Sequence, residues 1–458
     1  MDPTTPSAAE EAAQRPRRLR RPALALGVLA AAHFTVSVDF NVVYIALPEI
    51  GRELGIAPVS LQWVVSAFSL GLGGFLLLGG RAVDRIGARR MLLLGAVLMG
   101  AASVFGALAV QPWVLIAARA VQGLGAAFLF PATLALVNTG FRQGPERNRA
   151  MAVWGTAGAF GALAGGALGG LLTSVFGWTS VFWLLVPLTT VIVLVAPQVL
   201  PADARTPSVA GFDLPGATLV TGGSLLVVLG ISRIQELGWL SWWSTGTVAL
   251  GFVVLGLLFL VERRAADPLL PLRLLTTRNL IVSVVLVFVV MGVVNALHFV
   301  YTTHVQDGLG LSPMAAGLGF LPQGAVAMLG SALLLPLLLN RWGARWTLLV
   351  GTLALGLTSV VFALAVAAGS YWAVLPAVVL LGLSAGTLYP AIFAAAGSDV
   401  DESEQGVGSA MVSTSQQVGA AVGLVALLAV GGSVSGTSWA GGAAAIAVAF
   451  LALAFPRR

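Results

Sequence analysis

The stretch GRAVDRIGARR, residues 80–90, lies between two long apolar runs and decides how the chain is expected to fold. It places one carboxylate, Asp84, among four arginines in the connection between two predicted membrane-spanning segments. The excess of positive charge in cytoplasmic loops would explain the arginines, but it explains neither Asp84 nor the paired glycines. The stretch therefore predicts a connection that has a task beyond reversing the chain.

Composition places the chain in a membrane. Of the 458 residues, 58% are hydrophobic and 9% are charged, and a soluble protein of this size could not bury so much apolar surface. Cysteine is absent, which excludes disulfides, thiol nucleophiles and cysteine metal sites. All 24 basic residues are arginine, which excludes a P-loop lysine and Schiff-base chemistry. The three histidines lack zinc-helix spacing, so we expect no metal site and no enzyme.

Fourteen apolar runs have about the 20 residues that a helix needs to cross a bilayer. They cover residues 23–47, 60–79, 91–110, 113–139, 150–172, 179–199, 214–232, 244–261, 280–302, 313–339, 346–367, 371–395, 406–430 and 436–455. If the runs are numbered as spans, 21 of the 24 arginines fall on one side. Because cytoplasmic loops carry such an excess, both termini are expected in the cytoplasm, and the charge indicates orientation rather than nucleic-acid binding.

Three segments recur late in the chain, in the same order and at offsets of 255, 256 and 259 residues. They are LGIAP (54–58) with LGLSP (309–313), RIGAR (85–89) with RWGAR (341–345), and GLGAAFLFPA (123–132) with GLSAGTLYPA (382–391). Collinear echoes at a stable offset predict two homologous halves, with a substrate site between them. Positions that only hold the fold should recur in both halves. The charged ones do not, since Asp39, Asp84 and Arg119 stand opposite Val294, Asn340 and Val378.

Six runs precede residue 200, six follow residue 279, and the two between them fall outside the repeat. Together with residues 80–90, this arrangement resembles the fourteen-span drug:proton antiporter (DHA2-like) branch of the major facilitator superfamily. The stretch resembles that superfamily's G-x-L-x-D-R-x-G-R/K-R/K pattern, from which Ala82 and Ala88 depart. The matching residues, to which the resemblance assigns a gating role, are Gly80, Asp84, Arg85, Gly87, Arg89 and Arg90.

The resemblance implies an all-α integral membrane fold of fourteen transmembrane helices, in two six-helix bundles plus two inserted helices. The expected divisions are a cytoplasmic tail at 1–22, an N-terminal bundle at 23–200, a linker with the inserted helices at 201–279, and a C-terminal bundle at 280–458.

The segment VDFNVVYIALPEI, residues 38–50, contains Asp39 within a predicted span. It resembles the branch's first-helix signature, L-D-x-T-I-V-N-V-A-L-P, although Asn41 and Tyr44 depart from it. A carboxylate within a span costs about 2.5–3.5 kcal/mol on insertion scales, so it needs a reason to be there. Asp39 is therefore predicted to carry a proton, with a structural hydrogen bond to a neighbouring helix as the alternative.

The segment RAVQGLGAA, residues 119–127, contains a second charge within a span, Arg119. It resembles the family's R-x-x-Q-G-x-G motif. Arg119 and Asp39 are expected at similar depths on neighbouring helices. We therefore predict that Arg119 pairs with Asp39 and competes with its proton, and a static ion pair is the alternative.

Glycines dominate GALAGGALGG, residues 161–170. The stretch resembles the antiporter motif G-x-x-x-G-P-x-x-G-G, with Gly166 in place of the proline. The matching residues are Gly161, Gly165, Gly169 and Gly170. The resemblance implies antiport, whereas tight helix packing alone would give the same spacing.

Several polar residues within the predicted spans could line a substrate cavity or bond to a neighbouring helix. Asn295 and His298 are three residues apart and so share a helix face. The predicted cavity residues are Asn41, Gln122, Asn295, His298, Gln323 and Gln416. The acidic cluster at 399–404 is expected to be a solvated cytoplasmic loop.

The sequence thus predicts a proton-coupled multidrug or small-molecule efflux transporter that works by alternating access. It is expected as a monomer in a bacterial cytoplasmic membrane, in contact with the lipid bilayer, with small amphipathic or hydrophobic substrates and no cofactor beyond the proton. The alternatives are proton-coupled uptake by the same fold, and a non-transporting membrane sensor or scaffold.

Overall fold

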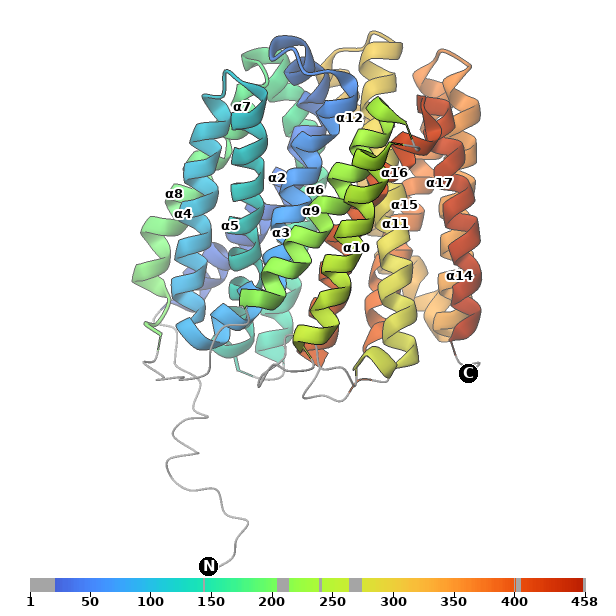
Figure 1. Ribbon diagram of the computed structural model, residues 1–458. Coiled ribbons are helices and arrows are strands. Elements are labelled where there is room, and N and C mark those ends of the chain that lie inside the picture. Colours follow the sequence, from blue (N-terminus) through green and yellow to red (C-terminus); the bar gives the residue numbers. More distant parts are fainter. Residues whose placement is uncertain are drawn as a thin grey trace, which may run out of the picture.

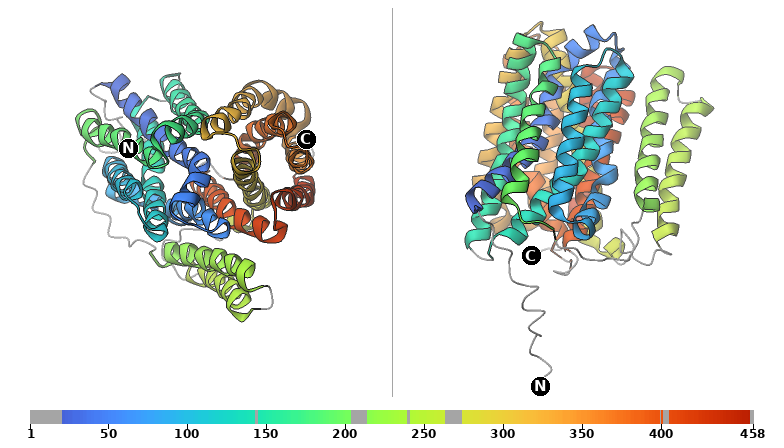
Figure 2. Two further views of the ribbon diagram at one scale, coloured as in Figure 1. Left: turned by 90° about the horizontal axis from the view of Figure 1, so that it is seen from above. Right: turned by 90° about the vertical axis from the view of Figure 1, so that its left-hand side faces the viewer.

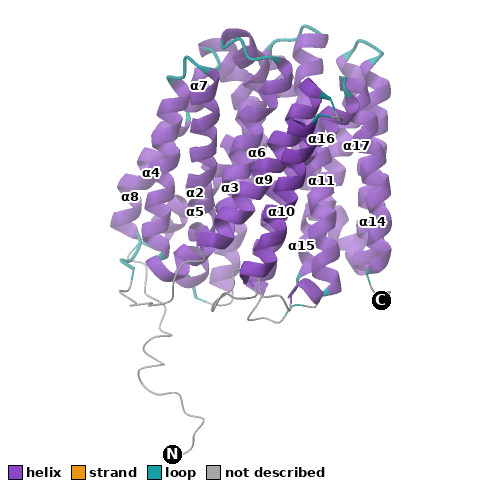
Figure 3. Ribbon diagram, in the orientation of Figure 1, coloured by secondary structure: helices purple, strands orange, loops and turns teal. Residues whose placement is uncertain are grey.

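The computed structural model describes residues 21–142, 145–203, 214–238, 241–262, 274–398, 400 and 405–455. Within these residues the chain is helical and contains no strand (Figures 1 and 3). The helices stand side by side as an upright bundle, and the first and last of them have their free ends on the same side (Figure 1). The predicted basic tail and acidic cluster lie outside the described residues, apart from Arg21 and Val400 at their edges.

The first half and the inserted pair consist of nine helices in the described residues. They are α2 (Pro22–Glu53), α3 (Pro58–Ile86), α4 (Ala88–Ala107), α5 (Pro112–Gly140), α6 (Pro145–Phe176), α7 (Thr179–Trp183), α8 (Leu185–Val199), α9 (Leu214–Leu237) and α10 (Trp242–Glu262).

The second half begins with a short 3-10 turn and contains two π-helical turns. Its elements are η1 (Leu274–Thr276), α11 (Arg278–Thr303), η2 (His304–Gly308), α12 (Pro313–Gly319), α13 (Leu321–Leu329), η3 (Gly330–Leu334), α14 (Leu335–Val366), α15 (Tyr371–Ala396), α16 (Gln405–Gly431), α17 (Val434–Ala449) and η4 (Phe450–Ala454).

Each predicted run coincides with helix in the described residues, although several boundaries move. By length and apolarity alone, ten helical segments of the described chain could cross a membrane. One of these, Pro313–Val366, contains two predicted runs. The chain is therefore a multi-pass membrane protein, and the number of fourteen spans stays a prediction.

The two halves pack in the same way. In the first half α3 and α4 both pack on α5, and in the second α13 and α14 both pack on α15. The repeated segments also make equivalent close approaches. A side chain on Gly123 would meet the backbone of α3 at Phe68 and Leu72, and one on Gly382 would meet the α13 backbone at Gln323. This agreement supports the internal duplication read from the sequence.

The stretch at 80–90 was expected to be a non-helical connection between two spans, and that expectation was wrong because all of it except Gly87 is helical. Helix α3 continues to Ile86, and α4 begins at Ala88. A single residue, Gly87, breaks the helix with a φ of 114°, a conformation that glycine adopts without strain. Its repeat partner Gly343, at φ 72°, breaks α14 in the same way. Polar residues end a bilayer-spanning run, but they do not end a helix.

The inserted pair lies at the periphery of the bundle (Figure 2). Helix α9 packs on α3 of the first half and on α16 of the second, while α10 packs on α9. The pair therefore covers one seam between the halves.

Candidate functional site

A buried ion pair joins α2 to α5 inside the first half. The Arg119 Nη1 atom lies 2.6 Å from Asp39 Oδ1. Both side chains are removed from solvent, with exposed fractions of 1% and 0%. Breaking such a pair by removing one partner leaves an uncompensated buried charge, so the two groups depend on each other.

Arg119 is held by several further contacts. Its Nε atom donates to the Val64 carbonyl of α3 at 3.0 Å, and Nη1 also donates to Gln122 Oε1 at 2.9 Å. The guanidinium carbon lies 4.5 Å from the centre of the Phe68 ring, close enough for a cation–π interaction. The orientation of Arg119 is therefore fixed by three helices.

Asp39 is less completely satisfied. One of its oxygens, Oδ1, accepts from Arg119, whereas Oδ2 is buried and has no hydrogen-bond partner among the described residues. A carboxyl group with one engaged and one vacant oxygen can take up a proton on the vacant oxygen. Protonation would then weaken the attraction that holds Arg119.

Gln122 and Asn41 lie apart from each other, although both were predicted to line a cavity. Gln122 is fully buried and donates to Ser103 of α4 at 2.8 Å, so it belongs to the Arg119 network. Asn41 donates to the Ser37 carbonyl on its own helix at 3.0 Å and packs against Gly165 of α6.

Three other predicted cavity residues gather around a tyrosine where the two halves meet. The Tyr44 hydroxyl of α2 donates to Asn295 Oδ1 of α11. The Tyr44 and His298 rings meet edge to face, with centroids 5.6 Å apart. The His298 Nε2 atom in turn lies 2.8 Å from Gln323 Nε2 of α13.

Sequence reasoning treated Tyr44 only as a departure from the family signature. A signal for its role existed, because a buried tyrosine hydroxyl usually needs a hydrogen-bond partner.

A second hydrogen bond between the halves lies one residue farther along α2. Gln306 Nε2, in the π-turn η2, donates to the Ile45 carbonyl at 2.7 Å. We call the two contacts Tyr44–Asn295 and Ile45–Gln306 the inter-half clasp. A third contact, the Met314 amide donating to Ser174 Oγ at 2.8 Å, joins α12 to α6 near the same end of the bundle. These contacts between the halves thus lie toward the C-terminal ends of α2 and α11. That side of the bundle is opposite the side of the two chain termini.

The α6 glycines make close approaches on two faces. A side chain on Gly165 or Gly169 would press on α2 at Val38 or Val42, and one on Gly170 would press on α12 at Pro313. Gly161 likewise approaches α2, and Gly166, which stands in place of the motif's proline, approaches Phe320. The stretch therefore packs α6 tightly against both halves at once.

The junction at Gly87 is tied to the end of α8 and to the segment that follows it. Asp203 accepts from the backbone amides of Arg89 and Arg90, at 3.0 and 2.9 Å, as a capping carboxylate does at a helix start. Arg89 Nη2 also donates to the Pro197 carbonyl at 3.0 Å. Asp203 was missed from the sequence, while the side chain of Asp84 lies outside the described residues.

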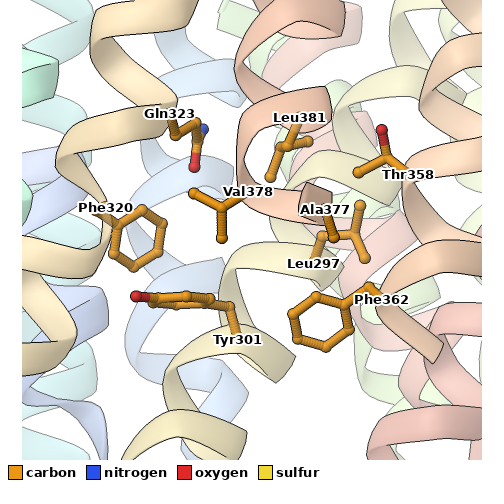
Figure 4. A pocket seen from close by; sticks show the side chains of 9 residues that line it. All are labelled: Leu297, Tyr301, Phe320, Gln323, Thr358, Phe362, Ala377, Val378 and Leu381. Carbon is orange, nitrogen blue, oxygen red and sulfur yellow. The ribbon is translucent and has the colours of Figure 1, made fainter. Parts of the chain in front are cut away.

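The second half repeats the helix packing found around the Asp39–Arg119 pair, but it has apolar residues at the repeat positions of these two charges. A small cavity of about 10 Å³ lies among α11, α13, α14 and α15 (Figure 4). Val378 and Leu381 line it at the repeat positions of Arg119 and Gln122, and Gln323 faces it as well. The remaining predicted residue, Gln416 of α16, lies close to the Tyr389 side chain of α15.

Tyr44→Phe is expected to loosen the clasp while preserving the ring packing. The loss of one hydrogen bond costs about 0.5–1.5 kcal/mol, which shifts the ratio of clasped to unclasped molecules roughly 2- to 12-fold. A cysteine placed at Asn41, three residues before Tyr44 and so on the inner side of the clasp, should then react faster with a membrane-impermeant maleimide added outside intact cells. An unchanged labelling rate would remove Tyr44 from the closure of this end.

Comparison with known proteins agrees with this geometry. The family model described as Major Facilitator Superfamily matches residues 29–424. A puromycin resistance protein, pur8, of Streptomyces alboniger is 37% identical over 417 residues, covering 88% of this chain and 80% of that protein. The cephamycin export protein CmcT of Amycolatopsis lactamdurans is 34% identical over 428 residues, covering 90% of this chain and 85% of that protein.

A solved structure shows the same fold. The crystal structure of the peptide transporter POT superposes with a TM-score of 0.71 and covers 98% of each chain, at 16% identity. With a family model that spans most of the chain and two relatives aligned over 80% and 85% of their length, this chain belongs to the major facilitator superfamily.

Proposed function

We propose that this protein exports small amphipathic or hydrophobic compounds across a bacterial cytoplasmic membrane in exchange for protons. The observation that carries the proposal is the fully buried Asp39, which is paired with Arg119 through one oxygen and has its second oxygen vacant. Relatives named for puromycin resistance and cephamycin export support export over uptake and over a sensor without transport.

The proposed orientation has both termini in the cytoplasm, as the distribution of arginine favours. The inter-half clasp then lies toward the outer side, so the described conformation is closed to the outside. Alternating access would open this clasp and close the opposite side, with the two bundles rocking about a site between them.

The proposed coupling runs along α2. A proton that enters from outside neutralises Asp39 and weakens its hold on Arg119. Tyr44 lies five residues beyond Asp39, about 7.5 Å along the helix axis. A shift of α2 at Asp39 therefore reaches the clasp directly. The proton is the only coupling ion in this scheme, which uses no cofactor and one copy of the chain.

Proteoliposomes that contain the protein and a lumenal pH dye test this function. Addition of a transported compound, from a panel of antibiotics and lipophilic cations, is expected to trigger proton movement that empty liposomes do not show. Counterflow with a labelled compound separates export from uptake. A panel that moves no protons while the labelled compound still crosses would contradict proton coupling.

A further inference from the structure

A larger cavity lies between the two halves, beyond the clasp. Its volume is about 690 Å³, within the range of small-molecule sites. It is lined by the far ends of α2, α11 and α16, by the start of α3, by η2, and by the segment leading into α17. Both halves thus contribute walls.

The position of this cavity follows from the clasp. Its lining includes Pro48, three residues after the clasp residue Ile45, and Thr303 and Asp307, which flank the clasp residue Gln306. The same two chain segments therefore close the path on one side and form this cavity on the other. Opening the clasp would join the cavity to the space between the bundles.

The chemistry of the lining is mixed. Most of the wall is apolar, formed by side chains such as Ile56, Leu61, Phe299, Val300 and Leu428. Two exposed charges of opposite sign come from opposite halves, Arg52 on α2 and Asp307 in η2.

The charges remain available to a ligand. Arg52 uses Nε to donate to the Pro48 carbonyl at 3.3 Å. Its guanidinium attracts the carboxylates of both Asp307 and Glu49. Deeper in the wall, Thr437 is 1% exposed and its hydroxyl has no hydrogen-bond partner among the described residues.

We propose that this cavity is an exit site, which holds the exported compound after it has passed the clasp. The occupant is an amphipathic molecule whose apolar body lies on the aliphatic and aromatic wall. Its polar end offers an amine to Asp307 and a hydrogen-bond acceptor to Arg52, because these two charges line the cavity from opposite halves. The inference rests on the proposed export function, but its test reads out binding separately from transport.

The absence of cysteine makes a direct test possible, since each introduced thiol is the only one. Thr303→Cys and Ala429→Cys place a thiol in the lining, at α11 and α16. The full chain is reconstituted in nanodiscs and labelled with a membrane-impermeant maleimide, with and without puromycin. Puromycin is the probe because it combines an aromatic body with an amine next to an amide carbonyl.

Puromycin is expected to slow labelling at both positions. By mass action the slowing is about tenfold at ten times the half-protecting concentration. Asp307→Asn in the same background is expected to remove the protection. The matched control is Val430→Cys, which adjoins Ala429 but is 64% exposed and lies outside the lining. Its labelling rate is expected to stay the same.

Three labelling outcomes would count against the exit site. Labelling that puromycin leaves unchanged at both lining positions overturns it. Protection that survives Asp307→Asn, or that also appears at Val430→Cys, indicates a change of conformation rather than occupancy and overturns it too. Puromycin export by wild-type proteoliposomes is measured in parallel. Export without protection overturns the site and leaves the proposed function standing, whereas protection without export supports the site and contradicts export of this compound.

Discussion

Asp39→Asn is expected to abolish substrate-driven proton movement in proteoliposomes, and also to lower stability because it leaves the buried Arg119 charge without its carboxylate. Asparagine has nearly the same shape and can still accept a hydrogen bond from Arg119, but it cannot take up or release a proton. The proton on Asp39 is the element that the proposed cycle exchanges for substrate. The signal of the lumenal pH dye should therefore fall to that of empty liposomes at every substrate concentration.

Glu49→Gln is the matched control for this substitution. It removes a carboxylate from the same helix, ten residues farther along, in a partly exposed position away from Arg119. Its proton movement is expected to match wild type. Equal proton movement in Asp39→Asn and wild type would exclude Asp39 as the proton carrier.

Arg119→Ala is expected to be the most destabilising single change in this site. It would leave the Asp39 carboxylate buried without its partner, and it would also remove the donors to Val64 and Gln122. Removal of one partner of a buried pair costs about 3–5 kcal/mol. We expect a clear fall in the midpoint of thermal unfolding in detergent, together with loss of transport.

A double variant separates charge from packing. Asp39→Asn combined with Arg119→Gln removes both charges, and it should recover much of the stability that Arg119→Ala loses, without recovering proton coupling. Arg278→Gln removes an exposed arginine instead, and surface changes of this kind stay within about 0.5 kcal/mol. If Arg119→Ala unfolded at the same temperature as Arg278→Gln, the pair would not stabilise the fold.

The chain alone indicated the charged centre because charges are rare in apolar spans. Asp39 and Arg119 stood out for that reason, and their expected depths brought them together. Their neighbours were harder to predict. Arg119 bonds to the backbone carbonyl of Val64, and every residue has such a carbonyl, so no residue type marks it. Ser103 could not be placed beside Gln122 without the packing of α4 on α5.

The clasp was beyond sequence reasoning for a different reason. Tyr44 and Asn295 are 251 residues apart, and their pairing depends on how two separately packed bundles meet. Helix ends were missed because hydropathy locates the bilayer, not the hydrogen-bonded helix. Helix α2 continues past the apolar run to Glu53, with Pro48 inside it, and α3 continues through the polar residues up to Gly87.

In the proposed cycle, the one-sided placement of charge also limits how steep a gradient the protein could maintain. Among the described residues, Asp39 is the only carboxylate that is fully buried, and its repeat position in the second half is Val294. A single carboxylate carries at most one proton per cycle. One proton crossing a difference of one pH unit releases about 1.4 kcal/mol, and a membrane potential of 100 mV adds about 2.3 kcal/mol.

For a neutral compound the two contributions together support an outward concentration ratio of several hundred, since each 1.4 kcal/mol corresponds to about tenfold. A compound that leaves with one positive charge cancels the charge of the incoming proton, so only the pH difference drives its export. Its ratio is then limited to about tenfold per pH unit. A cell that relies on this exporter is therefore expected to exclude neutral compounds more completely than singly charged cations.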